Sequence, residues 1–420
     1  MVAKRAAFHN QVPSSHPIAG TAYALGLLCV VAGCDQKLGL ESFPDNQGGI
    51  VGTSPSSSGA GPSGTGAGGA SGTSPAVKTG TGGTMVLATA VGSVGGQPTT
   101  VAPIPAGCAP ISTTPGVVDP CGHAFGVAYS PDGRFLAIGS DDANPKVRVW
   151  RLADGMPLPD LAGQSPGTTY SVAFSPDSKT LAAAGYAGDG DSAHDVPCVW
   201  LWDMATGALI RTLRTNTGWY ADSVAFSNDG TLILTGGFDG AVELWRAADG
   251  RRTLSIPVNG TAHNVHFSPD NTRIIIATTD GEAHLYDITS GALLLGPLDI
   301  ASEMADAEMS PDGQQIATTW QSGNANNSVR IYNGTTGVLV QSLAGHSAYI
   351  SRVLWIDQNR MVSGDWSGQV ILWQRGADGS FALGKSWSTG GQSLGIGVSP
   401  DKTTIVTGGG GDNGFVFLTL

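Results

Sequence analysis

Short apolar runs alternate with a recurring polar turn along most of the chain after residue 120. The stretch AYSPDGRFLAIGS, which begins at Ala128, holds two apolar runs of strand length on either side of a Ser-Pro-Asp-Gly turn. Such a pattern is typical of a β-hairpin. Further copies begin at Ala173, Ala225, His266, Glu308 and Gly397, and an eroded copy begins at Val353.

The copies are evenly spaced. Their turn prolines, or the residues that replace them, are Pro131, Pro176, Asn228, Pro269, Pro311, Asp357 and Pro400, with steps of 45, 52, 41, 42, 46 and 43 residues. A third run of alternating apolar residues follows each hairpin, as in QVILW to Trp373, and most copies add a fourth run after a Thr-Gly or Ser-Gly turn. This period predicts a repeat protein with four short strands in each repeat.

Together these features resemble the WD-repeat β-propellers over Cys121 to Leu420, because the aromatic-Asp end of the third run and a Gly345-His346 pair accompany the turns. The resemblance implies an all-β fold, a seven-bladed β-propeller of four-stranded antiparallel blades, over residues 108–420. Closing the sheets into a ring protects their edges. In this family an N-terminal segment completes the last blade. We therefore expect a segment between Cys108 and Asp119 to supply the strand that is missing after Leu420.

In the same family the Gly-His pair belongs to a structural hydrogen-bonding device. Its Asp commonly lies six residues before the Trp that ends the third strand, and Asp239 and Asp280 match that position. Asn144, Asn326 and Ser367 stand there in other repeats. We expect this thinning to reduce rigidity without changing the fold.

The N-terminus has the pattern of an export signal. Lys4 and Arg5 precede an apolar run that ends in VAGC at Cys34, and this run is shorter than a membrane-spanning helix requires. Residues 31–34 resemble the lipobox of bacterial lipoproteins, which implies that residues 1–33 are a signal peptide and that Cys34 is acylated. A simple secretory signal that contains a cysteine is the alternative. We expect an exported protein, lipid-anchored to the bacterial cell envelope and facing the periplasm or the cell surface.

Residues 34–107 have the composition of a flexible linker rich in Gly, Ser and Thr. The stretch from Asn46 to Gly83 has almost no large apolar residue to offset the entropy of ordering. The formal net charge of the chain is −12, and removal of Lys4 and Arg5 with the signal makes it −14. No run of Lys or Arg occurs, so the charge argues against a nucleic-acid partner.

Three cysteines remain after the signal and the lipid anchor are set aside. Cys108 and Cys121 are close in sequence, and we predict a disulfide between them in an oxidising compartment, with Cys198 free and buried. None of the three has CxxC spacing, so neither a redox site nor a zinc site is supported. We predict no cofactor.

Catalytic motifs are weak. The sequences GQSPG from Gly163 and GQSLG from Gly391 have the spacing of a hydrolase nucleophile elbow, but both lie in loops that lead into a propeller strand. His263 and His266 are three residues apart on a strand and should not converge with His284. We therefore expect no catalytic residue and no enzyme activity.

One acidic loop is a weak calcium candidate. Asp189, Asp191 and Asp195 offer carboxylate oxygens in a glycine-rich stretch, as Ca²⁺ prefers. Their spacing matches no complete EF-hand loop, and a solvated surface loop is the alternative reading. We predict no other metal site.

A functional face is predicted from insertions and aromatic residues. Three repeats are lengthened between their second and third strands, at residues 141–146, 185–198 and 321–328. In the resembling family those loops share one face with the loops that lead into the innermost strand. The same face should carry Phe125, Tyr170, Trp219, Tyr220, Phe238, Tyr349 and Trp366. Large aromatic residues in loops are enriched where partners bind, although packing between blades is the alternative for each of them.

Our hypothesis is a membrane-anchored WD-repeat propeller that acts as a non-catalytic scaffold for a protein or peptide partner on its loop-rich face. Two alternatives remain. One is a propeller enzyme of the lactonase or quinoprotein type, which a metal in the central channel would favour. The other is a structural envelope protein, which the absence of an aromatic surface would favour. The fold alone does not choose among them.

Overall fold

The computed structural model describes residues 110–115, 118–119, 124–140, 147–163, 167–188, 196–216, 219–238, 240–298, 305–321, 327–408 and 414–420. The chain divides into two compact units, Met1–Ser93 and Val94–Leu420, and the first lies wholly outside the described residues. The predicted signal peptide, Cys34, Cys108 and Cys121 therefore lie outside them, as do Asp189, Asp191 and Asp195.

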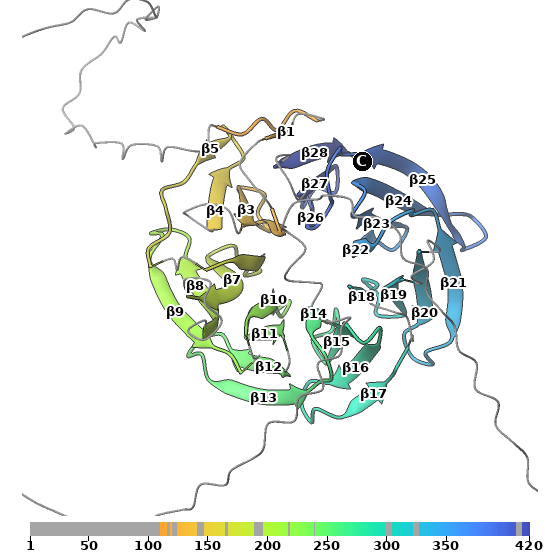
Figure 1. Cartoon of the computed structure of the whole chain (residues 1–420), viewed down its shortest axis with the longest axis horizontal. Helices are drawn as coiled ribbons and strands as arrows, with labels where there is room; N and C mark the ends of the chain where they lie inside the picture. Colours follow the sequence, from red (N-terminus) through yellow and green to blue (C-terminus); the bar gives the residue numbers. More distant parts are fainter. Residues whose placement is uncertain are drawn as a thin grey trace, which may run out of the picture. The chain divides into compact units, whose positions relative to one another are not determined.

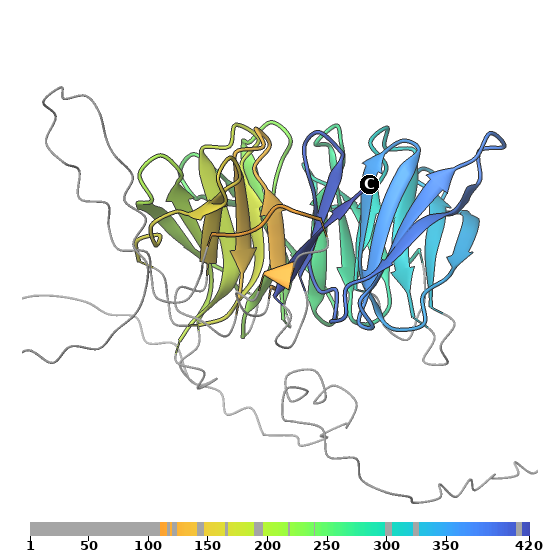
Figure 2. The ribbon, with the colours of Figure 1, turned by 90° about the horizontal axis from the view of Figure 1, so that it is seen from above.

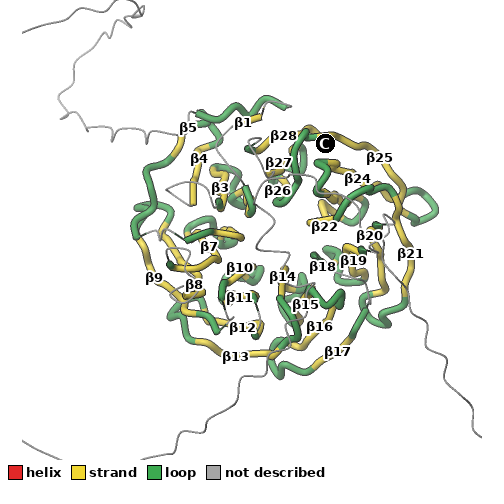
Figure 3. The backbone as a smooth tube through the Cα atoms, in the orientation of Figure 1, coloured by secondary structure: helices red, strands yellow, loops and turns green. Residues whose placement is uncertain are grey.

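Seven four-stranded antiparallel sheets surround a common axis, which confirms the predicted all-β propeller (Figure 1). Strands and loops make up the described residues, without a helix (Figure 3). Blade 1 holds β2 (Gly126–Tyr129), β3 (Phe135–Gly139), β4 (Val147–Arg151) and β5 (Met156–Pro157). Blade 2 holds β6 (Thr169–Phe174), β7 (Thr180–Ala187), β8 (Val196–Asp203) and β9 (Leu209–Arg214). Blade 3 holds β10 (Ala221–Phe226), β11 (Leu232–Gly237), β12 (Ala241–Arg246) and β13 (Arg252–Pro257).

The remaining blades follow the same order from the axis outward. Blade 4 holds β14 (Ala262–Phe267), β15 (Arg273–Thr278), β16 (Ala283–Asp287) and β17 (Leu293–Leu295). Blade 5 holds β18 (Ala307–Met309), β19 (Gln315–Trp320), β20 (Ser328–Asn333) and β21 (Leu339–Ala344). Blade 6 holds β22 (Ile350–Asp357), β23 (Arg360–Asp365), β24 (Gln369–Arg375) and β25 (Phe381–Ser388). Blade 7 holds β26 (Ile396–Val398), β27 (Thr404–Gly408), β28 (Phe415–Thr419) and β1 (Val118–Asp119).

Blade 7 is completed by the N-terminal segment, as expected. Strand β1 pairs antiparallel with β28, with Val118 opposite Val416. It is the outermost strand, so the preceding Pro115 does not interrupt a central ladder. Nearby, Ile111 is buried and donates its backbone N–H to Gly155 O of blade 1 at 2.8 Å. The segment therefore joins the last blade to the first.

The Ser-Pro-Asp turns are built by their own side chains. In blade 1 the Ser130 hydroxyl donates to Asp132 Oδ1 at 2.7 Å and accepts the N–H of Phe135 at 2.9 Å. The same Ser and Asp contacts recur at Ser175, Ser227, Ser268, Ser310 and Ser399. Gly133 follows with a φ of 71°, which suits glycine. The recurring sequence is therefore a turn with internal hydrogen bonds.

Each blade has two ends, which the side view of Figure 2 shows. We call the end that carries the Ser-Pro-Asp turns the turn face, and the end where each innermost strand begins the loop face. Blade 2 differs from the expectation at the loop face. The lengthened connection begins at residue 188 and not at 185, because Tyr186 pairs with Pro197 and Ala187 with Val196. The longer hairpin carries Tyr186 toward the loop face.

Candidate functional site

The seven predicted aromatic residues all lie at the loop-face ends of their blades. Phe238 donates its backbone N–H to Tyr220 O at 3.1 Å, and Trp366 donates to Tyr349 O at 2.9 Å. These bonds tie the end of each second strand to the start of the innermost strand. The shared face that the insertions predicted is therefore the face on which the structure places the aromatic residues.

Five of the seven form one continuous cluster across blades 1 to 3. Ring centroids are 5.7 Å apart for Phe125 and Tyr170, 4.8 Å for Tyr170 and Tyr220, and 5.4 Å for Tyr220 and Phe238. Trp219 stacks on Phe238 at 5.1 Å with an interplanar angle of 18°. Offset and tilted rings at these distances attract each other beyond their apolar contact. Residues from three separate repeats thus meet on one surface.

Tyr186 joins this cluster, although the sequence did not indicate it. Its ring lies 6.5 Å from that of Tyr170, and its hydroxyl lies 3.3 Å from Thr168 Oγ1. The extra ladder pairs of β7 and β8 put it there, and the uninterrupted run of apolar and small residues from Leu181 to Tyr186 is the signal that was available. We call the six residues Phe125, Tyr170, Tyr186, Trp219, Tyr220 and Phe238 the aromatic patch.

Tyr349 and Trp366 form a second, separate pair. Their rings are 4.7 Å apart in blade 6. The structure therefore divides the predicted set into two clusters. Both residues of this pair belong to one hairpin, whereas the rings of the aromatic patch come from three blades.

The aromatic patch is partly packed and partly exposed. Trp219 is 58% exposed, and the other five rings are half-buried. Other large apolar side chains with substantial exposure lie on outermost strands, such as Ile210, Leu294 and Val340. The rings of the aromatic patch thus combine packing against one another with exposure to solvent, and Trp219 is the most exposed of them.

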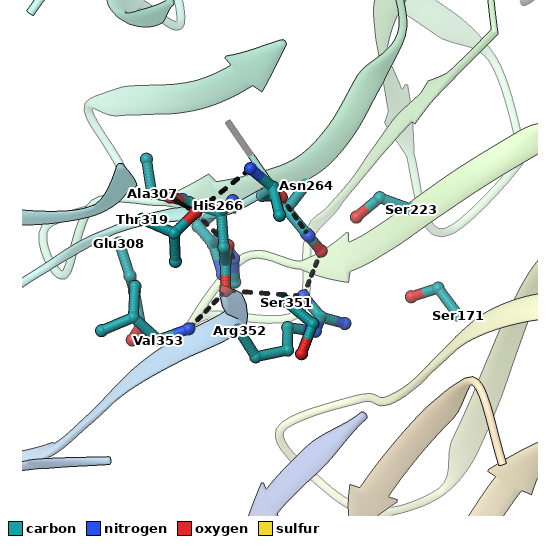
Figure 4. A network of polar contacts seen from close by, with 12 residues as sticks. Ser171, Ser223, Asn264, His266, Ala307, Glu308, Thr319, Ser351, Arg352 and Val353 are labelled. Carbon is teal, nitrogen blue, oxygen red and sulfur yellow. Dashed lines mark hydrogen bonds and ion pairs between the residues drawn. The ribbon is translucent and has the colours of Figure 1, made fainter. Parts of the chain in front are cut away.

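A buried polar network lies among the innermost strands of blades 4 to 6 (Figure 4). Asp306 is fully buried, and its Oδ1 lies 3.0 Å from His266 Nε2. Its Oδ2 accepts the N–H of Val353 at 3.1 Å and lies 3.8 Å from Arg352 Nη1. The guanidinium of Arg352 also donates to Asn264 Oδ1, so its side chain spans from blade 6 to blade 4.

The network shifts the acidity of its members. Burial would raise the pKa of Asp306, but His266 and Arg352 hold it below the ordinary value. Burial would lower the pKa of His266, but Asp306 and then Glu308 raise it. Burial raises the pKa of Glu308 to about 7, although its Oε2 accepts the N–H of Trp355 at 2.7 Å. The site therefore contains one carboxyl group that titrates near neutral pH.

The Gly-His device is complete in blade 6. His346 Nδ1 lies 2.9 Å from Asp365 Oδ2, and its Nε2 lies 2.7 Å from Ser363 Oγ. Trp373 donates its indole N–H to the same Ser363 hydroxyl at 2.8 Å. The acid is Asp365 and not the residue six before Trp373, because Ser367 forms the tight turn and donates to Asp365. These four side chains are buried, so they stabilise the blade.

The structure places Ser393 and the three histidines, but not Ser165, among the described residues. Ser393 is fully buried and shares a hydrogen bond with Thr407 Oγ1 at 2.6 Å, while Ser165 lies outside those residues. His263, His266 and His284 each contact a different acid, namely Asp222 at 2.6 Å, Asp306 at 3.0 Å and Glu282 at 3.5 Å. Each of these three histidines therefore lies beside an acid of its own.

Among the residues that the structure describes, there is no group of three or more His, Cys, Asp or Glu that could hold a metal ion. The same residues include no helix long and apolar enough to cross a membrane. Cys198 is free and buried in β8, and burial raises the pKa of its thiol.

Comparisons with known proteins identify the repeats. Residues 117–151, 207–246 and 337–374 match the family model of the WD domain, G-beta repeat, so the chain carries WD40 repeats. Protein groucho of Drosophila melanogaster is 32% identical over 128 residues, which cover 30% of this chain and 16% of groucho. Hydrazine synthase of Kuenenia stuttgartiensis aligns with a TM-score of 0.60 and 16% identity over 71% of this chain and 96% of the solved chain. The likeness to hydrazine synthase shows the fold alone.

Proposed function

We propose that this chain is a lipid-anchored propeller that binds a protein partner through the aromatic patch and has no catalytic activity of its own. The aromatic patch is the observation that carries the proposal. Six rings from three blades meet on the loop face, and Trp219 is 58% exposed. Aromatic residues are enriched at protein interfaces and supply much of their binding energy.

The repeats support the same role, because WD40 propellers generally bind protein partners. A scaffold needs a rigid frame under its binding surface. The antiparallel sheets and the closed ring supply that frame, and the aromatic rings are tied to it by backbone hydrogen bonds such as Phe238 N–H to Tyr220 O.

The anchor and the location belong to the proposal as well. They are supported by the apolar run that ends in VAGC at Cys34 and by the glycine-rich residues that follow. We propose acylation of Cys34 and attachment to the bacterial cell envelope. Intact-mass measurement of the membrane-extracted protein should show acyl chains, and Cys34→Ser should remove them. Unmodified Cys34 in the wild-type protein would overturn the anchor.

The binding role is tested by partner recovery. The full chain is cross-linked in its host membranes and purified, and the recovered partner is quantified for the wild type and for a variant with Trp219→Ala and Phe238→Ala. We expect recovery to fall at least about tenfold, since aromatic anchors each contribute roughly 2 kcal/mol.

Matched controls truncate exposed apolar side chains elsewhere. Leu294 and Val340 are 51% and 56% exposed on outermost strands. Leu294→Ala with Val340→Ala should leave recovery unchanged. Equal recovery from the aromatic variant and the wild type would contradict the proposal and favour the enzyme or the structural envelope protein.

A further inference from the structure

The innermost strands surround the axis of the ring, and equivalent residues on them differ in size from blade to blade (Figure 1). Blade 6 carries Arg352 on this strand. At the equivalent position, the four consecutive blades 7, 1, 2 and 3 carry only Gly395, Gly126, Ser171 and Ser223. Two residues further along, the same blades carry Gly397, Ala128, Ala173 and Ala225, and the three alanines are partly exposed. These four blades therefore place no long side chain opposite Arg352 at the two positions.

A series of hydrogen bonds connects Arg352 to the two serines. The guanidinium of Arg352 donates to Asn264 Oδ1, so it reaches from blade 6 to blade 4. The residue after Asn264 is Val265, which donates its N–H to Ser223 Oγ at 3.3 Å. The residue after Ser223 donates its N–H to Ser171 Oγ at 3.4 Å. Figure 4 shows both serine hydroxyls on the side that faces Arg352. Blades 2, 3 and 6 thus direct polar groups toward one place near the axis.

These three side chains have hydrogen-bond donors to spare. Arg352 uses only Nη1 for its contacts with Asn264 and Asp306, so its Nε and Nη2 have no partner among the described residues. Each serine hydroxyl accepts a backbone N–H but donates its own hydrogen to none of these residues. Ser171 and Ser223 are 4% and 3% exposed, and the Arg352 side chain is 16% exposed. Buried donors usually have an acceptor, so the arrangement favours a ligand that accepts hydrogen bonds.

The charges around Arg352 favour an anion at mildly acidic pH. Burial raises the pKa of Glu308 to about 7, so its carboxyl group is mostly neutral at about pH 6. Burial would lower the pKa of His266, but Asp306 and Glu308 raise it above its ordinary value, so the ring carries a proton at that pH. Burial would raise the pKa of Asp306, but His266 and Arg352 hold it below its ordinary value, so it stays ionised. Arg352 and His266 are then two cations beside the single carboxylate of Asp306.

We propose that Arg352, Ser171 and Ser223 form a binding site for a small carboxylate ion at the axis of the ring. A guanidinium group can donate two parallel hydrogen bonds to a carboxylate, and such charged hydrogen bonds are about twice as strong as neutral ones. The carboxylate of Asp306 disfavours a doubly charged anion, so the site should prefer a carboxylate to phosphate. We call these three residues the axial site. It shares no residue with the aromatic patch and goes beyond the proposed function.

Binding is measured on the full chain by fluorine NMR, with fluoroacetate as the probe. At about pH 6 the resonance of fluoroacetate should broaden, and acetate should reverse the broadening while acetamide should not. Binding should weaken at least about threefold at about pH 8, where Glu308 adds a second carboxylate. At that pH inorganic phosphate should displace the probe less effectively than acetate. The absence of broadening, equal displacement by acetamide or stronger displacement by phosphate would each overturn the proposal.

Two variants locate the bound probe. Arg352→Gln removes the cation and should weaken fluoroacetate binding at least about tenfold. Ser171→Ala with Ser223→Ala leaves the charged groups in place and should weaken it about fivefold or more. Ser393→Ala is the matched control, because it removes a buried hydroxyl that bonds Thr407 Oγ1 instead, and it should leave the affinity unchanged. Wild-type affinity in either test variant would overturn the proposal, and the serine variant decides if Arg352→Gln does not fold.

Discussion

The innermost strands of blades 1 to 3 and of blades 4 to 6 place different residues at equivalent positions. Two positions of each innermost strand, four and two residues before the turn serine, hold only small residues in blades 1 to 3. The first position holds Gly126, Ser171 and Ser223, and the second holds Ala128, Ala173 and Ala225. In blades 4 to 6 they hold Asn264, Asp306 and Arg352, then His266, Glu308 and Leu354. On the loop face, by comparison, it is blades 1 to 3 that carry the large side chains, because the aromatic patch belongs to them. The same repeat thus carries a buried polar network in blades 4 to 6 and a partly exposed aromatic patch in blades 1 to 3.

In both halves a side chain near the start of one innermost strand accepts a backbone N–H from the innermost strand of the next blade, but the accepting group differs. The Ser223 hydroxyl accepts the N–H of Val265 in the next blade at 3.3 Å, and the Ser171 hydroxyl accepts that of Val224 at 3.4 Å. Asp306 accepts the N–H of Val353 at 3.1 Å in the same manner. A buried carboxylate requires a cationic partner that a hydroxyl does not, and His266 and Arg352 meet that need. We therefore expect stability to depend more on blades 4 to 6 and binding more on blades 1 to 3.

The largest expected effect compares Asp306 with its serine counterpart. Asp306→Ala leaves His266 and Arg352 without their shared carboxylate in a buried site, so it should lower the free energy of unfolding by about 3–5 kcal/mol. Ser223→Ala removes one neutral hydrogen bond and should lower it by about 1 kcal/mol. Urea denaturation of the purified proteins measures both. Equal losses would show that the two halves are energetically alike.

A second prediction uses the pKa of Glu308, which burial raises to about 7. Between the ordinary value and about 7 the folded protein holds a proton that the unfolded chain has lost, so the free energy of unfolding falls as pH rises. The free energy of unfolding should therefore fall by about 3 kcal/mol less in Glu308→Gln than in the wild type between about pH 5 and about pH 8. The pKa of His266 is also raised, so its titration contributes to the wild-type slope with the same sign. Denaturation at the two pH values tests this, and identical slopes would contradict it.

A third prediction concerns the N-terminal segment that completes blade 7 and contacts blade 1. Deletion of residues 34–90 should leave the melting temperature unchanged, because the propeller core lies beyond them. Deletion through Asp119 also removes β1 and the buried Ile111, and it should cost about 2 kcal/mol. Calorimetry of the two truncated proteins provides the comparison. Equal melting temperatures would mean that β1 does not contribute to closure.

The smallest expected change in stability comes from the aromatic patch. Because Trp219 is 58% exposed, Trp219→Ala should change the free energy of unfolding by no more than about 0.5 kcal/mol. The matched buried substitution is Trp373→Ala, which removes a contact to Ser363 and a large core side chain and should cost at least about 3 kcal/mol. Similar losses for the two tryptophans would show that Trp219 serves packing and not binding.

Sequence patterns were sufficient for the local parts of this protein. The period of the Ser-Pro-Asp turns predicted seven blades, because each turn is built from hydrogen bonds between residues two and five apart. The closing segment before Asp119 and the loop-face placement of seven aromatic residues also followed from the repeat. The acid that contacts His346 in blade 6 did not follow from the repeat, since Asp365 lies two residues before the position that the family pattern indicates.

The sequence by itself thus determined the strand order, the turns and the end of the blade at which each side chain lies. All of these depend on interactions between residues close in sequence. Only the tertiary structure decided which of those side chains meet. Arg352 contacts Asn264 across 88 residues, and Tyr170 contacts Tyr220 across two blades. Such contacts depend on the twist and spacing of neighbouring sheets, which no single repeat encodes. Tyr186 entered the aromatic patch for the same reason, because two extra strand pairs placed it beside Tyr170.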